Sequence, residues 1–240
     1  MVKLDLFFAC VSIYTMLAQK NFVLLSLEGN IGSGKSTVLQ KLKETYPDWI
    51  YVDEPVNEWL TLKNSEGESL LEVFYKNKAR WSYTFQNAAV LYRYKKLRAA
   101  IDSLDGKSAV IVMERCLETD RQIFCKMLHK DGYIDDLEKK LYEDWFQHLN
   151  SMILPVDGYI YINTGPELSF SRVSKRAREG ESVIPLEYLQ ELHSYHKEWL
   201  LGEKNTKPVL DFDNTSEYLN TDLIYSYVQG LLLPKILSSK

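Results

Sequence analysis

The segment FVLLSLEGNIGSGKSTVLQKL, residues 22–42, constrains the fold more than any other part of the chain. It predicts an apolar strand, a glycine-rich turn and a helix, and the turn matches G-x-x-x-x-G-K-[ST] from Gly29 to Ser36. Such a turn points backbone N–H groups at a triphosphate, and the helix N-terminus adds partial positive charge. Lys35 can reach the β- and γ-phosphates, and the Ser36 hydroxyl can bind Mg²⁺. The expected phosphate-binding residues are Gly29, Asn30, Ile31, Gly32, Ser33, Gly34, Lys35, Ser36 and Thr37.

Composition restricts what else the chain can be. Its 240 residues, 45% of them apolar, suit one α/β domain with a sizeable core. The formal net charge of −4 argues against a general nucleic-acid-binding protein, which would carry a broad positive surface. Three widely spaced cysteines, Cys10, Cys116 and Cys125, form no metal-ligand pattern. They indicate reduced thiols in a cytoplasmic compartment.

The first twenty residues differ in pattern from the rest of the chain. Their apolar run from Leu6 to Ala18 is too short to span a bilayer, although it could form the apolar part of a signal peptide. Against export, a protein that uses a nucleoside triphosphate needs a compartment that supplies one. We expect residues 1–20 to be an extension, residues 21–240 to form a single domain, and no membrane association.

Apolar runs alternate with helical stretches along the rest of the chain. The strand-like runs lie at 22–28, 49–54, 109–115, 159–164 and 208–212. Buried parallel strands are near-continuous apolar runs, with functional groups at their C-terminal ends. The connections are long enough for helical crossovers, and the segments 81–104 and 134–154 are long enough for substantial helices. The expected architecture is an α/β P-loop NTPase fold, a five-stranded parallel sheet with helices on both faces.

Charged residues end two of these strands. Glu54 closes the second one in YVDEPVNEW, where it is either a general base facing a ligand or a surface acid that caps a loop. The third ends in MERCLETDR, where Glu114 could hold Mg²⁺ directly or through water. Arg115 follows and could offset charge in a transition state. Asp120 then begins a predicted helix, and an acid there could be purely structural.

An arginine-rich segment, SRVSKRAREGE, spans residues 171–181. Arg172, Arg176 and Arg178 are spaced R-x-x-x-R-x-R at the end of a predicted helix, and a solvated basic face is the usual explanation of such a run. In a phosphate-transferring protein, the stretch of about 172–183 could instead form a lid. It would supply bidentate donors and exclude water.

A further helix is predicted in WSYTFQNAAVLYRYKKLR, residues 81–98. Gln86, Ala89, Val90 and Arg93 fall on one face of it by helical periodicity. The glutamine amide both donates and accepts hydrogen bonds, which suits the edge of a nucleobase.

Taken in order, these motifs resemble those of the deoxyribonucleoside kinase family. The resemblance runs from about residue 22 to residue 232, in GNIGSGKS, DEPVNEW, YKNKARWSYTFQ, MERCLETDR, the R-x-x-x-R-x-R segment and IPLEYLQELHSYHKEWL. It implies ATP- and Mg²⁺-dependent phosphorylation of the 5′-hydroxyl of deoxyribonucleosides in nucleotide salvage. Members of this family are cytosolic or mitochondrial, and residues 1–20, with Asp5 and no arginine, make a poor mitochondrial presequence, so a cytoplasmic location is expected. Members of the family are commonly homodimers, so the helices at 81–104 and 134–154 are expected at an interface.

The resemblance also implies residue roles. Glu54 corresponds to the catalytic general base and Arg115 to the arginine of the E-R-S motif. Gln86 corresponds to the glutamine that pairs with the nucleobase of the substrate. The three arginines of the R-x-x-x-R-x-R segment correspond to lid arginines. Tyr75 and Glu187 correspond to the pair that holds the sugar 3′-hydroxyl. The implied catalytic residues are Lys35, Glu54 and Arg115. The implied nucleoside pocket comprises Glu54, Trp59, Tyr75, Phe85, Gln86, Ala89, Arg93, Arg115, Asp120 and Glu187.

Three pocket positions bear on the preferred base. Ala89, Arg93 and Asp120 are similar to the residues of deoxycytidine and deoxyguanosine kinases, whereas thymidine-preferring members carry bulkier or apolar residues there. An Arg93–Asp120 pair would crowd the thymine methyl group and favour an amino-bearing base. The implied preference is for deoxycytidine and deoxypurines. The alternative is a thymidine-preferring or multisubstrate kinase.

Two features of the sequence depart from the family pattern, and two other functional classes are alternatives. Cys116 stands where the family usually has serine, and the segment 211–219 only loosely matches the family's nucleotide-base loop, so UTP remains possible as a donor beside ATP. A nucleoside monophosphate kinase is one alternative. A nucleotide-binding switch of the GTPase type is another, but its N-K-x-D motif is not matched by NKAR at residues 77–80.

Overall fold

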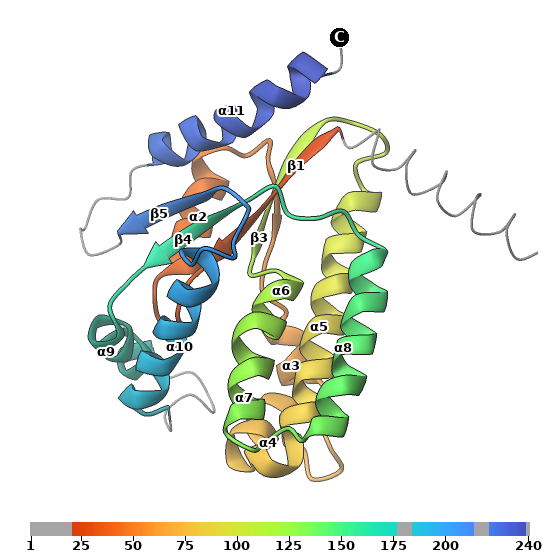
Figure 1. Ribbon diagram of the computed structural model, residues 1–240, viewed down its shortest axis with the longest axis vertical. Coiled ribbons are helices and arrows are strands. Elements are labelled where there is room, and N and C mark those ends of the chain that lie inside the picture. Colours follow the sequence, from red (N-terminus) through yellow and green to blue (C-terminus); the bar gives the residue numbers. More distant parts are fainter. Residues whose placement is uncertain (1–20, 177–183, 214–220, 239–240) are drawn as a thin grey trace, which may run out of the picture.

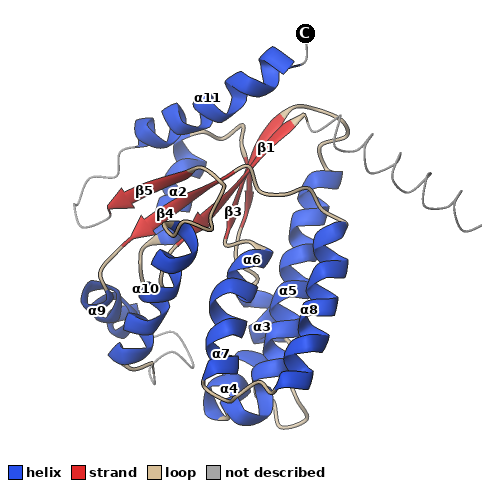
Figure 2. Ribbon diagram, viewed as in Figure 1, coloured by secondary structure: helices blue, strands red, loops and turns tan. Residues whose placement is uncertain are grey.

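The computed structural model describes residues 21–176, 184–213 and 221–238. Its five strands pair in parallel in the order β2–β3–β1–β4–β5 (Figures 1 and 2). Because β1 pairs with β3 on one side and β4 on the other, the strand order reverses at β1, where open parallel sheets bind ligands. The five-stranded parallel fold predicted from the sequence is confirmed. The strands are β1 (Phe22–Glu28), β2 (Ile50–Val52), β3 (Ala109–Glu114), β4 (Gly158–Asn163) and β5 (Val209–Asp213).

The helices of the described residues connect these strands and cover both faces of the sheet. They are α2 (Lys35–Thr45), α3 (Val56–Thr61), α4 (Leu70–Lys76), α5 (Lys78–Asp102), α6 (Leu117–Thr119), α7 (Lys126–Lys130), α8 (Asp136–Ser151), α9 (Pro166–Arg176), α10 (Leu186–Leu200) and α11 (Thr221–Ser238). A π-helical turn, η1 (Asp120–Cys125), lies between α6 and α7.

Both faces of β1 are buried, and its side chains alternate between two apolar clusters. Leu25 and Leu27 pack with residues of α2 and α11 on one face. Leu24 packs with residues of α5 and α10 on the other. This arrangement explains the uninterrupted apolar run in the sequence, because a strand covered on both faces has no solvent-facing side.

Helices α3, α4, α5, α7 and α8 lie together beyond the C-terminal edge of the sheet and are called the helical bundle (Figure 1). A third apolar cluster, which includes Trp59, Phe85 and Phe146, fills its interior. Local sequence fixes where two of these helices begin. Reciprocal capping boxes join Ser69 to Glu72 at α4 and Asp135 to Glu138 at α8.

Several predicted boundaries shift. The strand predicted at 49–54 is shorter, because β2 ends at Val52. The strand predicted at 109–115 ends at Glu114, since Arg115 adopts a left-handed backbone with φ of 61°. The prediction that Asp120 begins a helix is wrong, because the chain is already helical from Leu117 and Asp120 opens the π-helical turn.

Two predicted segments fall largely outside the described residues. Helix α9 ends at Arg176, so Arg178 and the rest of the expected lid are not described. The same holds for most of the segment 211–219. Within the described ranges, no helix has the length and apolar character needed to cross a membrane.

Candidate active site

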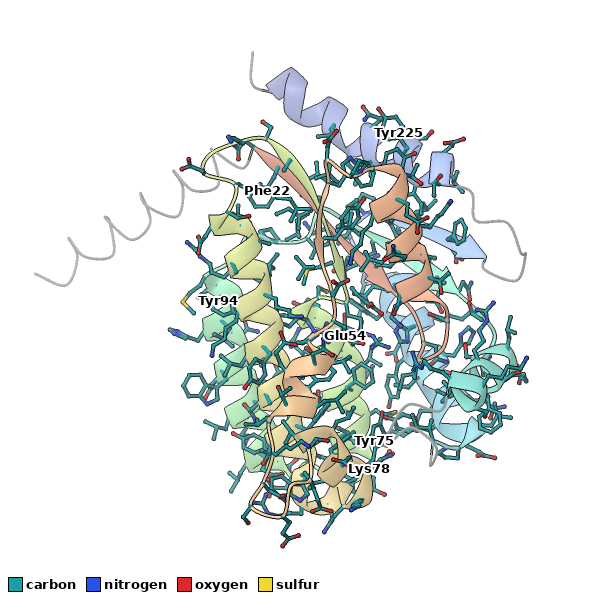
Figure 3. All side chains as sticks on the ribbon, turned by 180° about the vertical axis from the view of Figure 1, so that it is seen from behind. Phe22, Glu54, Tyr75, Lys78, Tyr94 and Tyr225 are labelled. Atoms are coloured by element: carbon teal, nitrogen blue, oxygen red, sulfur yellow. The ribbon has the colours of Figure 1, made fainter. Side chains whose placement is uncertain are left out.

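A cavity of about 480 Å³ opens at the C-terminal edge of the sheet, where it meets the helical bundle. Figure 3 shows Glu54 near the sheet, with Tyr75 farther along the bundle. Most residues selected from the sequence line this one cavity. They are Ile31, Gly32, Gly34, Lys35, Ser36, Thr37, Glu54, Trp59, Tyr75, Phe85, Gln86, Arg93, Glu114, Arg115, Asp120, Arg172 and Arg176.

The other selected residues lie elsewhere. Ala89 is buried in the apolar cluster of the helical bundle. Glu187 is exposed in the first turn of α10, whereas its neighbour Tyr188 lines the cavity. Gly29, Asn30 and Ser33 are buried within the turn of residues 29–36, named the phosphate-binding turn after its predicted role, and Arg178 is not described.

The phosphate-binding turn needs glycine where α9 crosses it. Gly32 has φ of +76°, and an added Cβ would lie 2.4 Å from the carbonyl oxygen of Ser169 in α9. The Asn30 side chain donates to the carbonyl of Leu189 at 2.8 Å and so ties the turn to α10. Lys35 Nζ donates to the carbonyls of Gly29 (3.1 Å) and Asn30 (2.7 Å). The turn is therefore held in shape by its own lysine and by two neighbouring helices.

Ser36 and Glu114 meet on the floor of the cavity. The Ser36 hydroxyl lies 3.2 Å from each carboxylate oxygen of Glu114. Burial and the nearby Glu54 raise the pKa of Glu114, so a bound cation there would relieve an unfavourable environment. The hard oxygen donors fit Mg²⁺, which keeps several waters and takes its remaining ligands from phosphates. In the described part of the chain, no cluster of three or more metal-ligating side chains offers a rival site.

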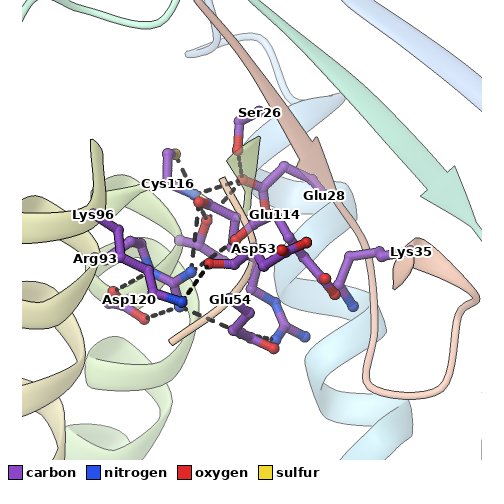
Figure 4. A network of polar contacts seen from close by, with 12 residues as sticks. Ser26, Glu28, Lys35, Asp53, Glu54, Arg93, Lys96, Glu114, Cys116 and Asp120 are labelled. Atoms are coloured by element: carbon purple, nitrogen blue, oxygen red, sulfur yellow. Dashed lines mark hydrogen bonds and ion pairs between the residues drawn. The ribbon is translucent and has the colours of Figure 1, made fainter. Parts of the chain in front are cut away.

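Glu54 is held by two arginines. Its Oε1 accepts from Arg115 Nη1 at 2.5 Å and from Arg93 Nη2 at 3.3 Å (Figure 4). Burial alone would raise the pKa of Glu54, but Arg115, Arg93 and Lys35 together lower it to about 2. The carboxylate is therefore ionised at neutral pH. Both of its hydrogen bonds within the described residues end on Oε1, which leaves Oε2 for a substrate hydroxyl.

Arg115 reaches Glu54 from a strained backbone. Its left-handed φ costs a residue other than glycine about 1–2 kcal/mol, and its N–H donates to the carbonyl of Leu27 at 3.1 Å. The guanidinium also donates to the carbonyl of Gly29 at 3.2 Å and lies over the ring of Phe124. One side chain thereby joins the carboxylate to the phosphate-binding turn.

Arg93 and Asp120 form the pair expected from the sequence. Arg93 Nε donates to Asp120 Oδ2 at 2.9 Å and Nη2 to Oδ1 at 3.3 Å, which makes the pair bidentate. Arg93 Nη1 donates to the carbonyl of Glu114 at 2.8 Å. Although burial opposes the charge of Arg93, Asp120 and Glu54 raise its pKa, so it stays charged at only 1% exposure.

Aromatic rings form the wall of the cavity within the helical bundle. Phe85 packs edge-on against Trp59, with centroids 5.1 Å apart, and stacks on Phe74 at 4.4 Å. Gln86 is 1% exposed and lines the same wall. Among the residues that the structure describes, none donates to its Oε1. A flat ring that carries an amino group would fit between these apolar faces and supply that missing donor.

Five lining residues were not selected from the sequence. Phe124 lies four residues after Asp120, so helical spacing from a selected residue could have indicated it. Tyr188 directly follows the selected Glu187 but lies on another face of α10, so spacing gave no signal for it. The remaining three carry no chemical signal in the sequence, because apolar residues are common in every core. They are Val56, Leu71 and Phe74.

Comparison with known proteins matches residues 25–227 to the family described as deoxynucleoside kinase. The chain is 36% identical over 219 residues to the deoxycytidine kinase of Mus musculus, an alignment that covers 83% of each protein. It is 38% identical to the deoxycytidine kinase of Homo sapiens, over 74% of this chain and 75% of the relative. It is 33% identical to the mitochondrial deoxyguanosine kinase of Xenopus laevis, over 86% of this chain and 90% of the relative.

Binding of a nucleoside triphosphate should protonate Lys35. Burial and Arg115 lower its pKa to about 7, so at pH 8 most molecules carry a neutral lysine until a polyphosphate restores the charge. Calorimetry with MgATP at pH 8, in two buffers of different ionisation enthalpy, should show uptake of about one proton per nucleotide. Lys35→Arg, whose charge is permanent, should abolish the uptake. Equal proton uptake by both proteins would contradict this assignment.

Proposed function

Because the chain belongs to the deoxynucleoside kinase family, we propose that its cavity transfers the γ-phosphoryl group of ATP to the 5′-hydroxyl of a deoxyribonucleoside, preferring deoxycytidine and deoxypurines. One observation supports this reaction above the others. An ionised carboxylate, Glu54, shares a single cavity with the phosphate-binding Lys35 and with the base-sized aromatic wall around Gln86. The phosphate donor, the acceptor hydroxyl and the nucleobase would thus occupy adjoining parts of the cavity.

In the proposed reaction, Glu54 Oε2 accepts the hydrogen bond of the 5′-hydroxyl and aligns its oxygen with the γ-phosphorus. A pKa near 2 makes Glu54 a weak base. A weak base is sufficient, because the transition state of phosphoryl transfer is loose and the hydroxyl proton leaves late. Lys35 and Arg115 then stabilise negative charge on the migrating group. Arg172 and Arg176, which line the same cavity from α9, add further cationic donors.

We assign the magnesium site to the Ser36 hydroxyl and the Glu114 carboxylate. When bound, Mg²⁺ would screen the charge of the β- and γ-phosphates. The chain's own part is to place these two oxygens at the start of α2 and the end of β3, beside the turn that holds the phosphates.

The proposed base preference rests on the buried polar groups at the end of the cavity. The Arg93–Asp120 pair occupies space that the thymine methyl group would need, and Gln86 Oε1 requires a donor. Cytosine and adenine each present an exocyclic amino group, whereas thymine presents a carbonyl oxygen in the corresponding place. The Gln86 amide both donates and accepts, so it can pair with either kind of base edge, and the proposed discrimination against thymidine rests on the Arg93–Asp120 pair and the thymine methyl group.

We propose one kinase domain over residues 21–240, with a lid at about 172–183 and residues 1–20 as an extension. The single sheet of the described residues supports this division. We propose a cytoplasmic location, because Cys116 and Cys125 are free and buried, as in a reducing compartment.

We also propose a homodimer formed through α8 and the adjoining face of α5. Leu137, Leu141 and Trp145 are spaced four residues apart on α8 and are 75%, 50% and 52% exposed. Leu91 of α5 is also exposed, and α5 packs against α8 in the helical bundle. An apolar stripe along two adjacent helices fits a second copy of the same surface.

Replacing Glu54 with glutamine should separate binding from turnover. The amide keeps the shape but cannot take the proton or place a negative charge between Arg115 and Arg93, so kcat should fall by about 10²–10⁴. The dissociation constant for deoxycytidine, measured by calorimetry, should change little. Glu58→Gln is the matched control, since Glu58 pairs with Lys96 outside the cavity and its variant should keep kcat. Wild-type turnover by Glu54→Gln would remove Glu54 from the mechanism.

A panel of four deoxynucleosides, each with ATP and with UTP, tests the base preference. We expect kcat/KM for thymidine to be lower than for deoxycytidine by about 10²-fold or more, because the Arg93–Asp120 pair would crowd the thymine methyl group. Gln86→Leu should raise KM for deoxycytidine, whereas Asn87→Ala, which removes only a bond to the carbonyl of Tyr83, should not. A preference for thymidine would overturn the roles given to Arg93 and Asp120.

Negative charge introduced into the apolar stripe of α8 should dissociate the dimer. Trp145→Glu combined with Leu141→Glu places carboxylates in the apolar stripe, so sedimentation equilibrium should show a shift from dimer to monomer. Leu201→Glu is the control, because Leu201 is equally exposed but follows α10. The interface is misplaced if the α8 variant remains dimeric, and no dimer exists if the wild type sediments as a monomer.

A further inference from the structure

Glu28 is a buried carboxyl that the proposed chemistry does not use. It is the last residue of β1, has no exposed surface and directly precedes the phosphate-binding turn. A single oxygen, Oε1, accepts from Ser26 Oγ at 2.5 Å, from Thr119 Oγ1 at 2.7 Å and from the backbone N–H of Cys116 at 3.3 Å (Figure 4). Among the described residues, none bonds to Oε2. Three donors that converge on one oxygen of a buried carboxyl fix the positions of the segments that carry them.

Two of these donors come from the segment that follows the strained residue of the site. Cys116 follows Arg115, one of only two residues other than glycine with positive φ in the described ranges. The Cys116 N–H points at Glu28 Oε1 and also at Thr119 Oγ1, 3.0 Å away. Thr119 Oγ1 in turn donates to Glu28 Oε1. One acceptor of the Cys116 N–H is therefore Glu28 itself, and the other is held in place by Glu28. On the other side, the Arg115 N–H is bound to the carbonyl of Leu27. Both peptide groups of Arg115 are therefore anchored to the end of β1.

The anchored backbone sets the direction of the arginine side chain. From this left-handed position, Arg115 bonds Glu54 through Nη1 and the carbonyl of Gly29 through Nη2. In an ordinary right-handed or extended conformation, the Cα–Cβ bond would leave the backbone in another direction. The guanidinium would then lose one or both of these partners.

We propose that Glu28 is a positioning residue for phosphoryl transfer, which holds the left-handed backbone at Arg115 and thereby keeps the guanidinium on Glu54. This inference rests on the proposed function for its kinetic consequence. Its structural content, the dependence of the Arg115 conformation on Glu28 Oε1, stands apart from it. What matters is an acceptor oxygen at this point, so glutamine should substitute for glutamate and an apolar side chain of similar length should not.

The experiment compares Glu28→Met with Glu28→Gln. Methionine fills the space without an acceptor, so kcat for deoxycytidine should fall about 30-fold or more while KM stays within about twofold, as for a misplaced catalytic group. Glutamine should keep kcat within about threefold. In an Arg115→Ala background, Glu28→Met should lower kcat by at most about a further threefold, because Glu28 acts through Arg115.

Tyr51→Phe is the control for simple destabilisation, since it removes bonds to the carbonyls of Leu42 and Tyr46 and should lower Tm without lowering kcat.

Crystal structures of the wild type and of Glu28→Met give a readout independent of activity. We expect φ of residue 115 to leave the left-handed region in the variant, with the contact between Arg115 Nη1 and Glu54 Oε1 broken. Unchanged φ, kcat retained by Glu28→Met, or equal losses with methionine and glutamine would each overturn the inference. If Glu28→Met does not fold, Thr119→Val takes its place, with about a tenfold loss of kcat and rescue by Thr119→Ser. A wild type that phosphorylates no deoxynucleoside would refute the proposed function, and the φ comparison would still decide the role of Glu28.

Discussion

The site depends on one carboxylate oxygen, Oε1 of Glu54, which two arginines share. Arg93 comes from α5 in the helical bundle, Arg115 from the end of β3 and Glu54 from the end of β2, so this oxygen joins the bundle to the sheet. Buried charges persist only in balanced groups. Three basic groups, Lys35, Arg93 and Arg115, line the cavity together with three acidic ones, Glu54, Glu114 and Asp120. A polyphosphate entering it needs further cations, which the arginines of α9 and a magnesium ion supply in the proposed reaction.

The parts predicted well from the sequence are those that local rules determine. The run at 22–28 coincides with β1, because a strand buried on both faces must be apolar throughout. The glycine-rich turn at residues 29–34 follows from glycines with positive φ, a conformation that other residues rarely adopt. Gln86 and Arg93 share a helix, so periodicity placed them on one face. The Arg93–Asp120 pair came from the family resemblance and is present in the structure.

The parts that escaped prediction depend on contacts between distant segments. Nothing near Glu28 in the sequence indicates that two of its three donors come from Cys116 and Thr119, since sheet register determines that meeting. Tyr188 enters the cavity because α10 lies against the phosphate-binding turn, a packing that helical periodicity alone does not give. The early start of the helix before Asp120 reflects the turn made possible by the left-handed Arg115. Tertiary context overrides local preference at these positions.

The strained backbone at Arg115 has a consequence for how the chain acquires its activity. The groups that hold it come from segments 88 residues apart, so they meet only after β1 and β3 have paired. Closing such a long loop is entropically unfavourable, and contacts of this kind form late in folding. The helical bundle and the phosphate-binding turn could each gain structure earlier without a correctly aimed arginine. Competence for phosphoryl transfer should thus appear as one of the last events of folding, and it should be among the first properties lost when the sheet loosens.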